Sequence, residues 1–195
     1  MINHHSNGLR HSAFTALLAG LAGLAGLAVS ACSDSTTAPA HFDPPGTYQS
    51  ALTMLGGTGQ GGVSVTPIAV PEAYFTASIK VRLHGAKPNT QYTVQRSPEV
   101  NRPLGHDGSC QRALGISPWA PGDTTASAFV TFTQPGTTTA VTLLSSASGD
   151  ASVDFNFSAP SVAAGTQFDV MFRVLDDLIA PSNLFLSGCF TVTVK

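Results

Sequence analysis

Two pairs of neighbouring residues have side chains that are able to bind a metal ion. His106 and Asp107 are adjacent in a long segment rich in proline and glycine, and Asp176 and Asp177 follow an alternating stretch that ends at Leu175. Imidazoles and carboxylates hold zinc when three or four converge, whereas Ca²⁺ takes carboxylate and carbonyl oxygens. The spacing matches no EF-hand loop. We therefore expect no cofactor, and keep Ca²⁺ or another metal at these four residues as the alternative to solvated turns.

The sequence carries no recognisable catalytic motif. Neither the GxSxG pattern of serine hydrolases nor the HExxH pattern of metalloproteases occurs. Two glutamates, Glu72 and Glu99, are present, and a carboxylate pair for glycoside hydrolysis depends on a separation that the sequence does not fix. Residues 57–62 (GTGQGG) match a dinucleotide-binding pattern by letters, but a strand-like VSVT follows where a helix should begin, which favours a hairpin. The sequence favours a protein that is not an enzyme.

A binding role has one aromatic candidate. Trp119 stands between Pro118 and Pro121 in residues 97–125, a segment without strand or helix periodicity. Long loops in compact domains often carry function, and a ring held by prolines can stack on a sugar or anchor a partner. The alternative is that Trp119 covers the edge of a sheet. We expect binding through the end loops, chiefly through residues 97–125.

Composition and charge narrow the possible partners. Charged residues make up 10% of the chain and the formal net charge is −2. No basic run occurs, and Lys80 and Arg82 are an alternating pair on one predicted strand. Binding to a phosphate backbone needs a concentrated positive patch. The sequence therefore predicts no nucleic-acid partner.

The elements that would position these residues are strands. Short runs alternate between apolar and polar residues and are separated by turn signals such as the Pro-Gly pairs at 121–122 and 135–136. The predicted strands are residues 48–55, 63–70, 75–83, 91–96, 127–133, 138–144, 151–157, 168–175 and 184–194. Alternation indicates one buried and one solvated face, which is typical of antiparallel sheets. This pattern predicts an all-β fold, an immunoglobulin-like antiparallel two-sheet sandwich after an N-terminal signal helix.

The first 31 residues have the parts of an export signal. Arg10 and three histidines lie in residues 1–12, and an apolar run covers residues 13–29. The following VSAC, residues 29–32, resembles the bacterial lipobox, in which the cysteine is acylated and becomes the new N-terminus. The resemblance implies a palmitate-type anchor on Cys32 in a membrane of the cell envelope, with the outer membrane favoured because Ser33 follows. An uncleaved membrane helix and a plain signal peptide cleaved after Ala31 are the alternatives.

The domain organisation follows from this signal. Residues 1–31 are a lipoprotein signal peptide, residues 32–45 are the lipidated cysteine with a flexible tether, and residues 46–195 are the β-sandwich domain. Cys110 and Cys189 remain as an even pair in an oxidising compartment, so a disulfide is expected. Cys189 shares its side of the last strand with threonines, which places the bridge on the outside or rim of the sheet. Two free thiols are the alternative.

Residues 83–94 (LHGAKPNTQYTV) resemble the end of one strand and the start of the next in fibronectin type III domains. The resemblance implies that Tyr92 makes a hydrogen bond that locks the corner and that Val94 points into the core. Small exported bacterial β-sandwich domains of uncharacterised function are similar over a longer stretch, which includes Cys110, the turn and strand of residues 149–157, and residues 165–170.

These observations lead to one functional expectation and two alternatives. The sequence favours a lipid-anchored protein of the cell envelope that is a non-catalytic binding or adhesion module for an envelope protein or glycan. The first alternative is a metal-dependent enzyme or metal-binding domain, and the second is a passive structural spacer. All-β sandwiches carry many functions, so the fold alone does not choose among the three.

Overall fold

The computed structural model describes residues 46–115 and 129–195. These residues belong to one unit, Phe42–Lys195. Several predictions concern residues outside the described ranges. They are the signal helix over residues 1–31, the lipobox with Cys32, the tether over residues 32–45, and Trp119.

The described residues form ten strands and one short helix. The strands are β1 (Tyr48–Met54), β2 (Gln60–Ile68), β3 (Tyr74–His84), β4 (Gln91–Pro98), β5 (Val130–Thr131), β6 (Thr142–Leu144), β7 (Ala151–Ala163), β8 (Gln167–Leu175), β9 (Leu184–Ser187) and β10 (Phe190–Thr193), and the helix is α1 (Gln111–Leu114). Each predicted strand overlaps a strand of the structure. The last predicted strand is divided, because the ladder is interrupted at Gly188 and Cys189 between β9 and β10.

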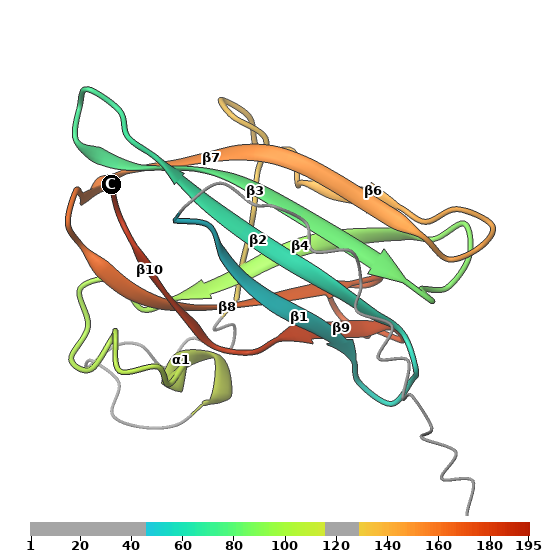
Figure 1. Ribbon diagram of the computed structural model, residues 1–195. Helices are drawn as coiled ribbons and strands as arrows, with labels where there is room; N and C mark the ends of the chain where they lie inside the picture. Colours follow the sequence, from blue (N-terminus) through green and yellow to red (C-terminus); the bar gives the residue numbers. More distant parts are fainter. Residues whose placement is uncertain (1–45, 116–128) are drawn as a thin grey trace, which may run out of the picture. The chain divides into compact units, whose positions relative to one another are not determined.

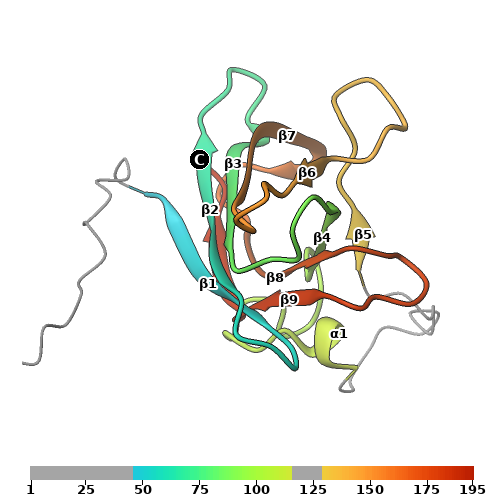
Figure 2. The ribbon, with the colours of Figure 1, turned by 90° about the vertical axis from the view of Figure 1, so that its right-hand side faces the viewer.

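The strands form one curled antiparallel sheet. Its order is β5-β4-β8-β9-β1-β2-β3-β7, with β10 paired to β8 and β6 paired to β4. The curl brings β2, β3 and β7 opposite β4 and β8 across an interior (Figures 1 and 2). The path ends at β5 and β7, and no ladder joins these two ends among the described strands. The predicted all-β, antiparallel class is confirmed.

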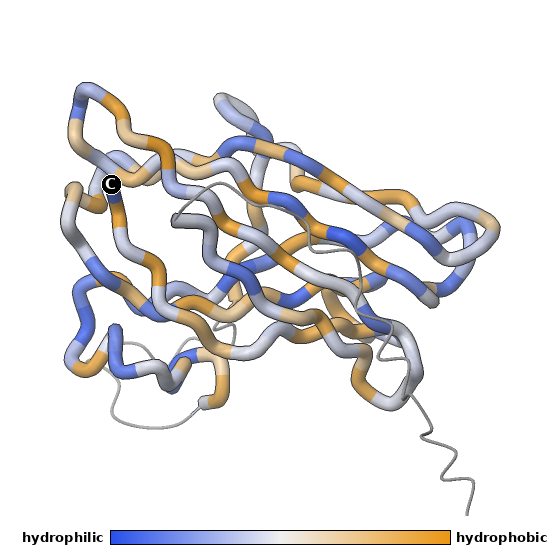
Figure 3. The backbone as a smooth tube through the Cα atoms, in the orientation of Figure 1, coloured by the Kyte–Doolittle hydropathy of each residue, from blue (hydrophilic) through white to orange (hydrophobic). Residues whose placement is uncertain are grey.

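Side-chain alternation explains why these segments form a sheet with an apolar interior. In β3, Ile79, Val81 and Leu83 are buried, and Lys80, Arg82 and His84 between them are not. Orange and blue segments alternate along the strands in Figure 3 for the same reason. The core collects the inward residues of β2, β3, β4 and β8 together with Phe132 and Phe185.

The glycine-rich residues 57–62 form a hairpin, as predicted. The Met54 amide donates to the Gly59 carbonyl at 2.9 Å, and β1 then pairs with β2. At Gly61 the backbone of β3 passes so close that a Cβ atom would lie 2.1 Å from the Arg82 carbonyl oxygen. Glycine is therefore required at this position for packing between strands, which explains the motif without a nucleotide.

The connection from β3 to β4 closes one end of the interior. The Lys87 amide donates a 2.9 Å hydrogen bond to the phenolic oxygen of Tyr92, which is fully buried. The Tyr92 ring packs edge-on against Phe185, with 6.0 Å between ring centroids. Val94 is fully buried in the core. The corner hydrogen bond and the inward position of Val94 are both confirmed.

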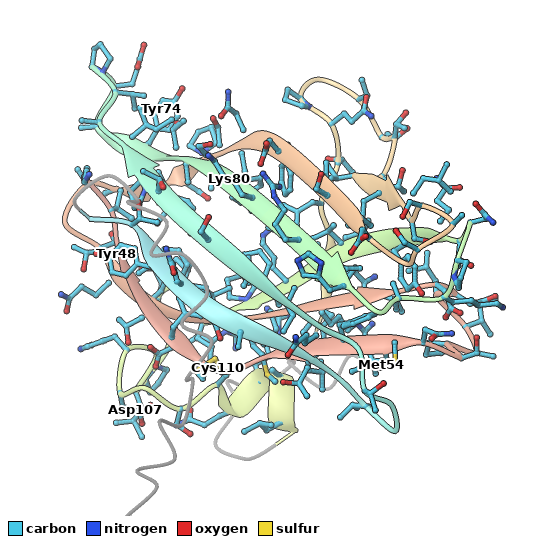
Figure 4. The ribbon with its side chains drawn as sticks, turned by 45° about the vertical axis from the view of Figure 1, so that its right-hand side comes forward. Tyr48, Met54, Tyr74, Lys80, Asp107 and Cys110 are labelled. Atoms are coloured by element: carbon cyan, nitrogen blue, oxygen red, sulfur yellow. A yellow bond between two sulfur atoms is a disulfide. The ribbon has the colours of Figure 1, made fainter. Side chains whose placement is uncertain are left out.

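Residues 99–115 fold back against the outer face of β8. Asp169 alternates with the core residues Phe168 and Val170, and therefore points outward. Its amide donates to the Gly105 carbonyl, and its carbonyl accepts from the Glu99 amide at 2.8 Å. The disulfide between Cys110 and Cys189 ties the same segment to the start of β10. The predicted pairing is confirmed, and Figure 4 shows Cys110 on the segment next to α1, below the sheet.

Candidate binding cavity

Asp176 and Asp177, one of the two predicted metal pairs, lie in the turn between β8 and β9. Asp176 accepts backbone and side-chain hydrogen bonds from Ser182 and Asn183. Burial by itself would raise the pKa of the Asp176 carboxyl, but these hydrogen bonds outweigh it and lower the pKa to about 2. The oxygen atoms that a cation would need already hold the turn together.

Asp177 supports the tip of the same turn. Its carboxylate accepts the amides of Ile179 and Ala180 at 2.7 and 3.0 Å, and these two bonds lower its pKa. The tip presents Leu178 and Ile179 to solvent, and the Ile179 side chain is 95% exposed. This turn is therefore a rigid projection with an apolar end.

His106 and Asp107, the other predicted metal pair, lie in a different part of the molecule. Asp107 accepts a hydrogen bond from the Ser109 amide at 2.9 Å and another from the Gln111 side chain at 3.1 Å, in the segment below the sheet (Figure 4). His106 precedes it in the same turn. Across residues 46–115 and 129–195, no group of three or more His, Cys, Asp or Glu side chains is arranged to hold a metal. The structure does not bring the two predicted pairs together.

One hydrogen-bonded chain has the composition of a catalytic triad but a different order. Asp150 accepts from the Ser148 hydroxyl at 2.7 Å and contacts Nδ1 of His84 at 2.8 Å. A serine nucleophile needs the histidine between the serine and the acid, so that the ring can take the proton. Here the aspartate is in the middle, which makes this a polar cluster that stabilises the end of β3.

An apolar cavity lies inside the curl, at the end opposite the Tyr92 corner. Its volume is about 230 Å³. Apolar side chains from both sides of the curl line most of it, and Arg96 is the charged residue among them. The lining residues are Val65, Phe75, Ile79, Arg96, Pro98, Val100, Phe132, Phe157, Ala159, Ser161, Val162, Phe168, Val170, Phe172 and Val192.

The cavity has its mouth between β4 and β7. Phe157, Ala159 and Ser161 of β7 are partly or fully exposed, and so are Arg96 and Pro98 of β4, whereas the lining residues from β2, β3, β8 and β10 are buried. β7 pairs with β3 along one edge, and its other edge pairs with no strand in the described part of the chain. β5 pairs with β4 only at Gln95 and Arg96. The open seam of the sheet thus coincides with the entrance to its interior.

Arg96 is held at this entrance by two aromatic rings. The central carbon of its guanidinium lies 4.3 Å from the centroid of the Phe132 ring and 4.1 Å from that of Phe157. The two ring centroids are only 5.2 Å apart and the rings are nearly perpendicular, so both pack against one side of the guanidinium. The group carries five N–H donors, which can serve an acceptor at the mouth.

The charge of Arg96 has no counterion in the described residues. Its Nη1 atom is buried and has no hydrogen-bond partner there. Burial lowers the pKa of the guanidinium from its ordinary value to about 10, and no carboxylate of the described residues offsets this effect. The group is still charged at neutral pH. An unpaired charge in an apolar setting costs free energy, so its presence calls for an explanation.

The strand pattern of the sequence marks Arg96 as an inward-facing residue, although Arg96 belongs to no catalytic or metal-binding motif. Tyr92, Val94 and Arg96 have the same parity on one strand, so the arginine must share the inward face with two core residues. A cation on an apolar face is more informative than acidic pairs in loops, because loops solvate charge at little cost.

Comparisons with known proteins find no match for this chain. No protein-family model matches the chain, and no curated protein or solved structure is significantly similar to it. The described helix is too short to cross a bilayer, and no other helix in residues 46–115 and 129–195 is long and apolar enough to do so.

Proposed function

We propose that this chain is a lipid-anchored protein of the cell envelope and acts as a non-catalytic binding module, with the cavity behind Arg96 as its binding element. The observation that carries the proposal is the 230 Å³ apolar space with an entrance at the seam between β4 and β7. A concave, mostly apolar cavity with few polar groups is the usual form of a small-ligand site. The lipobox-like residues 29–32 support the anchor.

The long segment considered for binding in the sequence contributes to this site at one point. Pro98 and Val100, from the start of residues 97–125, line the cavity, and the rest of the described part covers the outer face of β8. An envelope protein or glycan bound through Trp119 stays a separate prediction, because Trp119 lies outside the described residues.

For the architecture, we propose the immunoglobulin-like two-sheet sandwich that the sequence indicates. One layer would hold β1, β2, β3 and β7, and the other β4, β8, β9 and β10. Contacts across the interior support this arrangement, since Phe75 of β3 packs edge-on against Phe168 of β8 at 5.3 Å. The Tyr92 corner, a feature of such sandwiches, is a second support.

The test is binding of a neutral apolar ligand to the purified full chain. We expect 1-octanol to bind with a 1:1 stoichiometry in titration calorimetry. Ala159→Phe should remove this binding, because Ala159 lines the entrance and a phenyl ring there would fill it. Ser158→Phe is the matched control, since Ser158 neighbours Ala159 but faces solvent on the outer side of β7.

The outcomes separate the functional alternatives. Binding that survives in Ser158→Phe and is lost in Ala159→Phe supports a ligand in the cavity. Absence of octanol binding to the folded chain would contradict the cavity as binding element and would favour the passive spacer. Equal binding to both variants would place the ligand elsewhere.

A further inference from the structure

The geometry points to the class of ligand: we propose that the cavity takes a monoanionic aliphatic carboxylate, with its head group on Arg96 and its chain inside. This inference rests on the proposed function, because it names the ligand of the same cavity. Three features of the described residues carry it, namely the unsatisfied Nη1 donor of the guanidinium, the single charge of the lining, and the size of the space.

The unsatisfied guanidinium of Arg96 favours a planar oxyanion. Phe132 and Phe157 both contact the guanidinium, and their ring centroids are only 5.2 Å apart, so the two rings hold the group from one side. The buried Nη1 atom lacks an acceptor in the described chain. A carboxylate can accept two parallel hydrogen bonds from a guanidinium, one of them from Nη1. A neutral alcohol would satisfy fewer of these donors.

The charge of the lining favours a monoanion. Arg96 is the one charged side chain of the cavity lining, and the one polar companion is Ser161 at the exposed entrance. A phosphate monoester carries close to two negative charges at neutral pH and would keep one of them unpaired. A carboxylate carries one charge and would be neutralised by Arg96 alone.

The size and surface of the cavity favour an aliphatic chain of medium length. At about 30 Å³ for each non-hydrogen atom, the volume that one water takes in the liquid, 230 Å³ holds about eight atoms. Phe75, Phe168 and Val192 from three different strands surround this space and offer no hydrogen bond. Octanoate fits, because its seven tail carbons would fill the interior while its carboxylate stays at the mouth.

The arrangement also explains why Arg96 is tolerated without a counterion among the described residues. A bound carboxylate would supply the missing acceptor to Nη1 and neutralise the charge that burial disfavours. The free protein would carry an electrostatic cost that ligand binding removes. We therefore expect the site to select ligands by their charge more than by the shape of their chain.

The experiment compares octanoate with 1-octanol, which has the same chain without the charge, on the purified full chain. We expect octanoate to bind about tenfold to a hundredfold more tightly, the range that a charge-assisted hydrogen bond of this kind produces. Arg96→Met should bind both ligands with similar affinity, because it keeps an apolar side chain at the mouth. Arg82→Met is the matched control, since Arg82 is exposed on β3 and pairs with Asp154 at 3.1 Å. It should keep the preference for octanoate.

Each outcome has a distinct meaning. A preference for octanoate that disappears in Arg96→Met and persists in Arg82→Met supports the inference. Equal affinity of the unaltered chain for both ligands would overturn the carboxylate assignment and leave the apolar binding module standing. A preference that persists in Arg96→Met would overturn the role of Arg96. Failure of both ligands to bind would overturn the cavity function itself.

Discussion

The molecule holds buried charged groups on both faces of the β4–β8 pair, and the two faces differ in how completely these groups are hydrogen-bonded. On the outer face, Asp169 is fully buried and its carboxylate accepts hydrogen bonds from the Gly108 amide, at 2.8 Å, and from the Thr191 hydroxyl. On the inner face, Arg96 contacts the Phe132 and Phe157 rings and has no acceptor for Nη1 within the described residues.

The difference separates a structural charge from a candidate ligand contact. A buried charge whose hydrogen bonds are complete holds elements together, and Asp169 joins β8 to β10 and to residues 99–115. A buried charge with an open donor at the mouth of a cavity leaves a hydrogen bond that the described chain does not complete. The two sites should therefore respond to substitution with opposite signs.

The largest expected effect is at Asp169. Asp169→Ala should lower the free energy of unfolding by about 3 kcal/mol, because two hydrogen bonds to a buried carboxylate are lost and their donors stay buried. Chemical denaturation of the full chain measures this change. Asp154→Ala is the control, since it removes a carboxylate from an exposed ion pair with Arg82 and should cost less than about 1 kcal/mol. Equal losses in the two variants would mean that Asp169 is not a structural charge.

The second effect is smaller and of opposite sign. The lowering of the Arg96 pKa to about 10 corresponds to a burial cost of about 3 kcal/mol. Stacking on two rings offsets up to about 2 kcal/mol of it. Arg96→Met keeps the length and the apolar stem, so we expect the free energy of unfolding to rise by about 1 kcal/mol without ligand. A loss of more than 1 kcal/mol in the same denaturation assay would contradict the comparison.

The sequence was a good guide to the elements and a poor guide to the site. Alternation located every strand, because a half-buried strand must alternate wherever it lies in the sheet. The corner at Tyr92 followed from the resemblance of residues 83–94 to fibronectin type III domains, and the bridge between Cys110 and Cys189 followed from an even pair of cysteines in a chain expected to be exported. The cavity could not be predicted in this way, because its lining comes from strands distant in sequence and depends on how the sheet curls.

The acidic residues that the sequence offers as metal ligands have structural partners in the described chain. Asp107 and Asp176 attract attention as ligands, but a carboxylate in a turn accepts nearby backbone amides before it needs a cation. The acidic residues that are buried, Glu99 and Asp169, have no acidic neighbour in the sequence. Their burial depends on the fold of residues 99–115 against the sheet, which no local pattern indicates.

The smallest effect concerns pH and belongs to the outer site. Glu99 is 1% exposed, and its carboxylate accepts the Arg112 amide at 2.6 Å. Burial raises its pKa above 4.5, the Arg112 amide lowers it, Asp169 and Asp107 raise it, and Arg102 lowers it, with a net increase. The folded state therefore binds more protons than the unfolded state just above pH 4.5, and the contribution of Glu99 to stability falls as the pH rises through this range.

Glu99→Gln isolates this contribution because the amide oxygen can still accept from the Arg112 backbone and the side chain no longer titrates. The stability of Glu99→Gln minus that of the unaltered chain should increase from pH 4.5 upward and then level off, in denaturation curves taken between pH 4 and 8, a span of about 4 units that brackets the ordinary glutamate pKa. Glu72→Gln, in the exposed turn before β3, controls for the loss of one negative charge. A difference that stays constant with pH would mean that the outer face tolerates the Glu99 charge without cost, which would contradict the raised pKa of this carboxyl.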